Sequence, residues 1–295
     1  MHALCCRLAL LTFALVAATP ALAQQADSTT APTVRIYLKD GSEVIGTIQA
    51  ESETTIEFVT RSQVAMTIGK EQVERIAPVE EALLDGRYVR LDPNRTRLLF
   101  APTARPLGNG QGYIADYYIF FPFIAYGATN AVSLSGGISL LPFSPVQLVY
   151  AAPKVTVYAE RRASVALGVF AGTPIGDLGG EGGWVGLFYG LGTFGRPDAS
   201  VTAGIGFGAV NGEFSSRPAL LLGLERQVSN SVKLISENYA IFPNDDSFIV
   251  LSGGIRFFGQ RLATDLALVT SPDFLTEGGG FPFLPFIGFA YNFGR

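Results

Sequence analysis

Residues 201–210 read VTAGIGFGAV, and this stretch decides the fold because its side chains alternate strictly in kind. Successive side chains of a β-strand point to opposite faces. One face carries Val201, Ala203, Ile205, Phe207 and Ala209, and the other carries Thr202, Gly204, Gly206 and Gly208. An apolar face opposite a small or polar face is typical of a strand between lipid and a barrel lumen. Similar alternation recurs within 132–140, 165–169 and 287–293.

Short polar turns recur along the chain in steps of 30 to 36 residues, centred near Asn130, Arg161, Pro197, Asn230 and Gln260. Each step holds two segments of about ten residues with a longer Gly-, Pro- and Asp-containing loop between them. This repetition predicts hairpins with short turns on one side of a membrane and longer loops on the other.

We therefore predict an all-β protein with an antiparallel transmembrane β-barrel of about 12 strands over residues 96–295. The strands are expected at 96–105, 112–126, 131–141, 146–159, 163–173, 182–196, 199–210, 217–227, 231–242, 247–259, 261–271 and 283–293. An even number is typical of bacterial barrels whose two ends stay in the periplasm. The main alternative is a soluble β-sandwich with packed apolar faces, which would carry more charge on its outer faces.

The first 23 residues have the features of a cleaved signal peptide. Arg7 precedes an apolar core at residues 8–18, and Ala-Leu-Ala at 21–23 forms a cleavage site before Gln24. The alternative is a membrane anchor, but the apolar run is shorter than the ~20 residues that a helical span needs. A flexible lead-in is expected at 24–32. Export together with the predicted barrel indicates a location in the cell outer membrane.

Cleavage removes the only His and both Cys residues of the chain, which are His2, Cys5 and Cys6. The mature chain then lacks the usual ligands of zinc and haem and the usual Cys or Ser–His nucleophile systems. We expect no metal, no cofactor and no enzymatic activity. The best enzyme alternative is an outer-membrane phospholipase, which this chain resembles in its predicted twelve-stranded barrel. Those enzymes use a His–Ser pair, and the mature chain has no His.

The charge balance argues against nucleic acid as a partner. Without Arg7 the chain has 20 Lys and Arg against 25 Asp and Glu, and no basic stripe occurs. After residue 23 no apolar run approaches ~20 residues, so a membrane-spanning form must use strands. The expected partner is outer-membrane lipid.

Residues 33–78 have a different pattern, with five short alternating segments that predict a small closed barrel of the SH3 type. The stretch VRIYLKDGSEVIGTI at 34–48 resembles the Sm-like fold, with a Lys-Asp-Gly turn and a Gly in the second strand. Sm-like proteins bind RNA, but residues 33–78 hold five basic and seven acidic residues. We carry over the fold alone and expect a periplasmic domain that docks another protein through an exposed edge. A linker at 79–95 follows, with one helical turn expected at 80–84.

Charged residues inside the predicted strands are the candidate lumen-lining residues: Lys154, Glu160, Glu225, Lys233, Glu237, Arg256 and Asp265. Alternation turns most of them inward, because a charge facing lipid at the membrane midplane costs several kcal/mol, ~2–4 for Lys or Arg. They either pair with each other and brace a plugged interior, or form a charged constriction that selects a solute. The inward Gly residues likewise either relieve crowding or widen a pore.

Six aromatic residues at the start of the barrel favour an interfacial girdle: Tyr113, Tyr117, Tyr118, Phe120, Phe121 and Phe123. The alternative is an aromatic core.

The runs RLLFAPTAR at 97–105 and GQGY at 110–113 resemble those of uncharacterised exported Gram-negative proteins that join an N-terminal β domain to a barrel. The resemblance implies architecture and location only.

We predict a small passive, porin-like channel; the alternative is a non-conducting barrel that anchors the periplasmic domain.

Overall fold

The computed structural model describes residues 33–60, 63–78, 81–84, 87–176, 183–242, 248–276 and 281–294. The predicted signal peptide at 1–23 and the lead-in at 24–32 lie outside these residues. The chain divides into two compact units, Met1–Val79 and Glu80–Arg295. In the described part of the chain, no helix has the length and apolar character needed to cross a membrane.

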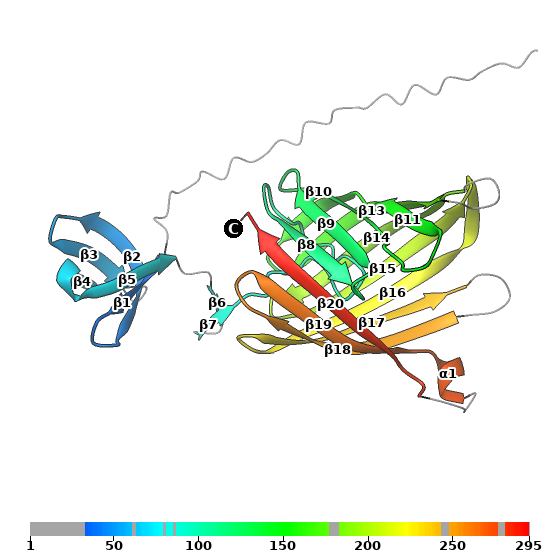
Figure 1. Cartoon of the computed structure of the whole chain (residues 1–295). Coiled ribbons are helices and arrows are strands. Elements are labelled where there is room, and N and C mark those ends of the chain that lie inside the picture. The colour runs from blue at the N-terminus through cyan, green and yellow to red at the C-terminus, as the bar shows by residue number, and fades with distance from the viewer. Residues whose placement is uncertain are drawn as a thin grey trace, which may run out of the picture. The chain divides into compact units, whose positions relative to one another are not determined.

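The N-terminal unit is a five-stranded antiparallel sheet with the strand order β4-β3-β2-β1-β5 (Figure 1). Its strands are β1 (Thr33–Leu38), β2 (Glu43–Glu51), β3 (Thr55–Thr60), β4 (Ala65–Gly69) and β5 (Val73–Pro78). The sequence predicted five short strands within residues 33–78, and this number is confirmed. A short 3-10 turn (Lys70–Gln72) joins β4 to β5. Inward apolar residues of β1, β3 and β4 form its buried core: Ile36, Ile56, Phe58 and Ile68.

Two local features explain the path of β1 and β2. In the β1–β2 turn the hydroxyl and amide of Ser42 donate to Asp40 Oδ1 at 2.6 and 2.8 Å. These bonds, the hydroxyl's first, lower the pKa of the Asp40 carboxyl. Gly41 has a φ of +86°, a conformation that favours glycine. In β2, a Cβ on Gly46 would lie 2.2 Å from the carbonyl oxygen of Val59, so only glycine fits this close approach of β2 to β3.

Two short strands, β6 (Glu81–Leu84) and β7 (Arg87–Arg90), come before the barrel in the sequence and pair with each other in antiparallel fashion. The helical turn predicted at 80–84 is therefore wrong. An isolated turn of helix gains few hydrogen bonds for the dihedral angles that it fixes, whereas β6 and β7 pair their backbone groups with each other.

The C-terminal unit is a closed antiparallel barrel, because β20 pairs with β8 and β9 pairs with β10. Thirteen segments form twelve strands, since β11 and β12 are two parts of one strand between β10 and β13. Pro153 separates these parts, because proline has no amide hydrogen for the ladder. The segments are β8 (Gly112–Tyr117), β9 (Phe121–Gly127), β10 (Val132–Ile138), β11 (Val146–Ala151), β12 (Lys154–Glu160), β13 (Ala163–Gly176), β14 (Val185–Arg196), β15 (Ala199–Val210), β16 (Glu213–Ser229), β17 (Val232–Ile241), β18 (Phe248–Phe258), β19 (Leu262–Thr270) and β20 (Leu284–Phe293). Helix α1 (Pro272–Thr276) precedes β20.

The predicted number of twelve strands is confirmed, but its first two members are wrong. Residues 96–105 are not a wall strand. The segment predicted as one strand at 112–126 is a hairpin, β8 and β9, whose turn has Tyr118 and Ile119 at φ values of 55° and 70°. The two errors cancel in the count. Neither turn residue is Gly, Pro, Asn or Asp, so no local turn signal marks this hairpin.

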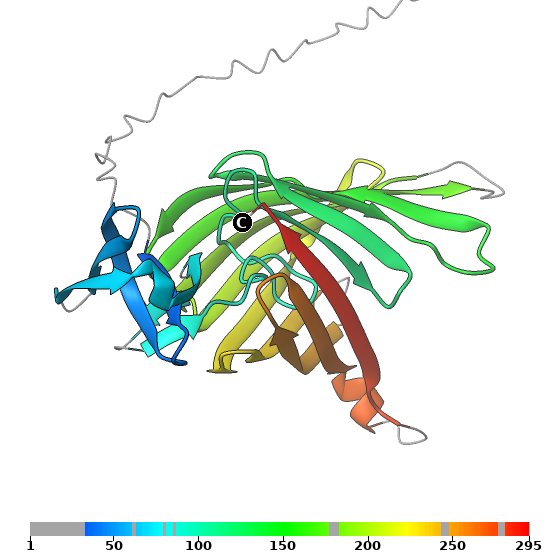
Figure 2. The same ribbon diagram turned by 60° about the vertical axis from the view of Figure 1, so that its left-hand side comes forward.

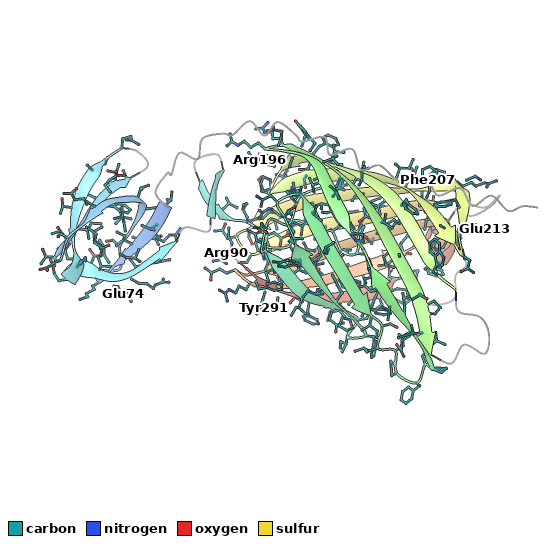
Figure 3. All side chains as sticks on the ribbon, turned by 90° about the horizontal axis from the view of Figure 1, so that it is seen from above. Glu74, Arg90, Arg196, Phe207, Glu213 and Tyr291 are labelled. Atoms are coloured by element: carbon teal, nitrogen blue, oxygen red, sulfur yellow. The ribbon has the colours of Figure 1, made fainter. Side chains whose placement is uncertain are left out.

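The strands connect as predicted at one end of the barrel, here called the short-turn end. Tight turns near Asn130, Arg161, Pro197, Asn230 and Gln260 lie there, with the start of β8 and the end of β20. The other end, here called the loop end, carries the remaining connections. Figure 3 shows Arg196 at the short-turn end and Phe207 and Glu213 at the loop end.

The outer face of the wall is apolar and the inner face is small or polar. In β15, Ile205 and Phe207 are exposed on the outside, whereas Thr202 is buried inside. Ala209, also expected on the outer face, is buried; its register partner on β16 is Phe214, whose exposed ring packs against that of Phe188 on β14. The exposed apolar face of a closed barrel is the surface that lipid covers in a membrane.

Candidate functional site: a plugged lumen and an apolar cavity

Residues 91–111, here called the plug, run inside the barrel before the first wall strand (Figure 2). Strands far apart around the wall bind this one segment. The Ala104 amide donates to Thr193 Oγ1 on β14 at 2.9 Å, and Thr156 on β12 donates to the Ala104 carbonyl at 3.0 Å. Asn292 on β20 donates to Asn94 Oδ1 at 2.9 Å. A segment that reaches β12, β14 and β20 must cross the lumen.

The tip of the plug is a tight loop packed against the wall. Arg97 and Pro102 form an isolated β-bridge, and the Leu98 amide donates to the Ala101 carbonyl at 2.8 Å. Leu98 and Leu99 are fully buried. Only glycine at position 223 on β16 leaves room for the Leu98 side chain, because a Cβ there would lie 2.2 Å from Leu98 Cδ1.

Arg256 on β18 is the centre of a buried ionic cluster that fixes the plug. Its Nε and Nη1 donate to Asp265 Oδ1 at 2.5 Å and to Asp92 Oδ2 at 3.0 Å. Nη1 also donates to the plug carbonyls of Asn94 and Arg97, and Nη2 donates to that of Leu98 at 2.6 Å. Arg97 of the plug donates to the same Asp265 at 2.6 Å. Charges of plug and wall thus compensate each other in a site that excludes water.

The cluster continues across β17 and β16. Lys233 lies 2.7 Å from Asp92 and 3.0 Å from Glu225, and Arg105 of the plug lies 3.3 Å from Glu225. Burial raises the pKa of the Asp92 carboxyl, but the charges of Lys233 and Arg256 outweigh burial and hold that pKa below its ordinary value. Asp92 therefore stays ionised at neutral pH.

Glu237 on β17 holds the plug and has no basic partner among the described residues. Its carboxylate accepts the backbone amides of Leu99 at 2.7 Å, Phe100 at 3.0 Å and Ala101 at 3.3 Å. The hydroxyl of Tyr239 donates to the same carboxylate. Three successive amides aimed at one anion fix the backbone of the plug tip.

Lys154 on β12 binds the far side of the plug. Its ammonium donates to the carbonyls of Thr103 at 2.6 Å and Arg105 at 2.8 Å. Within the described ranges, no carboxylate forms an ion pair with Lys154. It is therefore a buried cation whose charge only carbonyl dipoles compensate.

Six of the seven candidate lumen-lining residues lie inside the barrel, each no more than 5% exposed: Lys154, Glu225, Lys233, Glu237, Arg256 and Asp265. Every one of them bonds to the plug. Glu160 lies instead at the exposed end of β12, beside the turn at Arg161. The sequence interpretation missed the plug partners Asp92, Arg97 and Arg105. Their signal was a dense set of polar residues at 92–105 without strict alternation.

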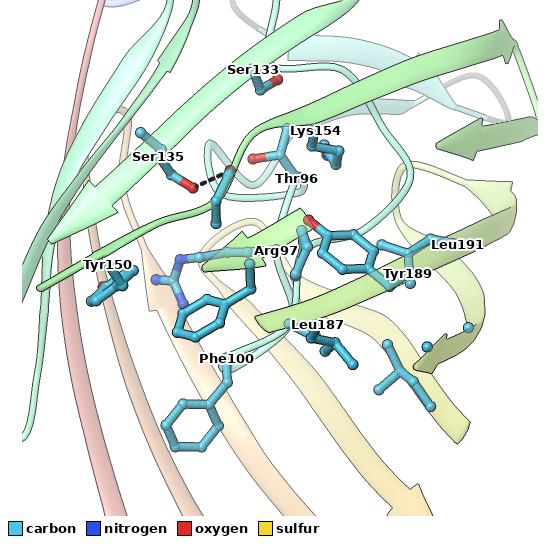
Figure 4. A pocket seen from close by; sticks show the side chains of 18 of the residues that line it. Thr96, Arg97, Phe100, Ser133, Ser135, Tyr150, Lys154, Leu187, Tyr189 and Leu191 are labelled. Atoms are coloured by element: carbon cyan, nitrogen blue, oxygen red, sulfur yellow. Dashed lines mark hydrogen bonds between the residues drawn. The ribbon is translucent and has the colours of Figure 1, made fainter. Parts of the chain in front are cut away.

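An apolar cavity of about 520 Å³ lies in the lumen beyond the plug, toward the loop end. Aromatic and aliphatic side chains of the wall line most of it, as Figure 4 shows for Tyr150, Tyr189, Leu187 and Leu191. Tyr113 and Tyr117, expected in an interfacial girdle, are instead buried and line this cavity. They face inward because Ile114 and other alternate residues of β8 take the outer face.

Polar atoms reach this cavity from the plug and from two wall strands, β10 and β12. Arg97 and Lys154 both line it, as does Ser133 on β10. Arg97 Nε and Nη2 and Ser133 Oγ are buried without a hydrogen-bond partner. Over the described ranges, no group of three or more His, Cys, Asp or Glu side chains is placed to hold a metal ion. The site is thus an apolar chamber with a cation at its plug end.

No protein-family model and no curated protein matches the sequence. Solved structures resemble the barrel. KdgM porin in complex with disordered oligogalacturonate has a TM-score of 0.47 at 9% identity, over 62% of this chain and 98% of that chain. LpxR from Salmonella typhimurium has a TM-score of 0.36 at 12% identity, over 63% and 100%. A loop-deletion mutant of OmpT, an outer membrane protein of Vibrio cholerae, has a TM-score of 0.35 at 10% identity, over 89% and 97%. Likenesses at this level concern the fold and carry no inference about activity.

Proposed function

We propose that this protein is a closed, non-conducting outer-membrane barrel that anchors its N-terminal β domain at the periplasmic side. One observation carries the proposal: the plug crosses the lumen and is bonded to strands all around the wall. A passive channel needs a continuous water-filled path. The buried side chains around Arg256 and the plug backbone that is bonded to Glu237 lie in that path.

The small passive channel predicted from the sequence is the competing function. Its support is the set of small inward residues, since Gly204, Gly206 and Ala219 all border the cavity. These residues, however, widen the lumen only beyond the plug. The inward charges, which could have formed a selective constriction, are used for plug bonding, and this favours the closed barrel.

Recording of the full chain in planar lipid bilayers tests the proposal. We expect stable insertion without discrete conductance steps, because ions would have to displace the buried Asp92, Lys233 and Arg256 cluster. A general porin inserted under the same conditions serves as the positive control. Regular, reproducible conductance steps from the pure protein would reject the closed barrel and restore the passive channel.

The N-terminal unit is proposed to dock a periplasmic protein and not to bind nucleic acid. Two features support this role. The unit is acidic, and its sheet ends in two strands, β4 and β5, that each pair with one neighbour only among the described strands. An edge strand offers unpaired amide and carbonyl groups to an added strand. The predicted export also separates this unit from cytoplasmic RNA.

Site-specific photo-cross-linking in cells checks the docking role. Thr67 on the edge strand β4 and Glu57 on the inner strand β3 are register partners, and both are exposed. A photoreactive residue at position 67 is expected to give one discrete adduct, and the matched residue at 57 none. Equal adduct patterns from both positions would contradict docking at this edge.

A further inference from the structure

We propose that the lumenal cavity binds an amphiphile with one acidic headgroup and an apolar tail, with the headgroup on Arg97. This goes beyond closure of the barrel, because a plugged lumen needs no ligand. The inference rests on two observations: the apolar cavity, and the guanidinium of Arg97 at its plug end, which has donors without an acceptor.

The chamber suits an apolar tail in size and lining. Its volume of about 520 Å³ falls within the ~300–1,000 Å³ of small-molecule sites. Phe123, Phe170 and Leu221 are among the side chains around it, and Gly206 and Ala219 face each other as register partners on its wall. Small residues on one side and large apolar residues on the other leave an empty space that favours an apolar ligand.

Arg97 supplies the recognition of an acid. Its side chain is 1% exposed, and only Nη1 has partners, including Asp265 at 2.6 Å. Nε and Nη2 have no hydrogen-bond partner within the described part of the chain, although both are buried. These two atoms form one edge of the guanidinium, which matches the two oxygens of a carboxylate or phosphate. A buried donor without an acceptor is costly, so an acidic headgroup would satisfy both once the side chains that cover this edge move aside to admit it.

The aromatic rings beside Arg97 restrict how the headgroup lies. The guanidinium carbon is 5.9 Å from the ring centre of Tyr113 and 5.8 Å from that of Tyr117. These rings cover part of the cation and favour approach of the acid along its free edge. The tail then extends from the plug toward Tyr118 and Phe121, which border the cavity at the loop end.

The charges of the plug and wall also favour an anion. The network has five basic side chains, Arg97, Arg105, Lys154, Lys233 and Arg256, and four carboxylates, Asp92, Glu225, Glu237 and Asp265. Lys154, which borders the cavity, is the cation without a carboxylate among the described residues. By formal charge, the basic side chains of this set thus exceed its carboxylates by one.

Binding of radiolabelled amphiphiles to the full chain in lipid nanodiscs tests the inference. The probes are palmitate, hexadecyl phosphate and hexadecanol, which share one tail. We expect saturable binding of one acidic probe per chain, with hexadecanol about ten- to a hundredfold weaker because it lacks the charged hydrogen bonds. Preference for palmitate or for hexadecyl phosphate identifies the headgroup.

Three variants assign the site. Ala219→Phe fills the cavity away from the ionic cluster and should abolish saturable binding. Ala203→Phe makes the same change on the outer face of the neighbouring strand, where Ala203 is exposed, and should bind as the unmodified protein does. Arg97→Gln should remove the preference for acidic probes over hexadecanol. Absence of saturable binding to the unmodified chain, or unchanged binding by Ala219→Phe, would overturn the inference. Either result is independent of conductance.

Discussion

Replacing plug residues 95–105 with a short Gly/Ser linker is expected to convert the closed barrel into a conducting one. The wall should persist, because its strands are paired around the whole circumference. The replacement removes Arg97, Leu98 and Leu99, which are buried in the lumen. Water can then hydrate Glu237 and Asp265, whose plug partners are gone. Bilayer recordings should change from a flat baseline to discrete conductance steps.

A deletion of residues 33–78 is the matched control for this variant. It removes the N-terminal sheet and keeps every plug residue, so the barrel should stay closed. A folded plug variant without conductance would contradict the assignment of the closure to residues 95–105. Conductance after deletion of 33–78 would assign the closure to the N-terminal unit instead.

Arg256→Ala is expected to lower the free energy of unfolding by about 3–5 kcal/mol, the usual cost of removing one partner from a buried ion pair. The substitution leaves Asp265 with Arg97 as its only basic partner and Asp92 with Lys233. It also removes the donors to the carbonyls of Asn94, Arg97 and Leu98. Urea unfolding of the refolded barrel in lipid, followed by the heat-modifiable gel shift, measures the change.

Arg161→Ala is the control for Arg256→Ala, because Arg161 lies exposed in a short turn. Its effect should stay within about 0.5 kcal/mol. Arg256→Lys should fall between the two, since a lysine keeps the charge but cannot reach five acceptors on different sides. Equal unfolding midpoints for Arg256→Ala and Arg161→Ala would show that the cluster contributes nothing measurable to stability.

The wall of the barrel could be predicted from the sequence because its rules are local. Alternation places one side chain out and the next one in, and turn residues mark the hairpin ends, so β13 to β20 were expected near their observed positions. The inward direction of Arg256 and Asp265 followed from the same alternation.

The plug could not be predicted by those rules. Arg97 bonds to Asp265, which lies 168 residues further along the chain. Residues 97–100 have enough apolar character to look like half of a wall strand, and their burial by the wall has no local signature. The cavity could not be predicted for the same reason, because the strands that line it, among them β8, β10, β14 and β16, are far apart in the sequence.

The central claim is that the segment before the first wall strand occupies the lumen, and cysteine labelling tests it most directly. Without residues 1–23 the chain has no cysteine. Ala104→Cys places a thiol at a plug residue with 0% exposure, and Asn230→Cys places one in an exposed short turn. With the barrel folded in lipid, a maleimide-linked polyethylene glycol should label position 230 and leave position 104 unmodified, and in urea it should label both. Labelling of position 104 at the rate of position 230, in a barrel that still runs as the folded form on a gel, would contradict the account.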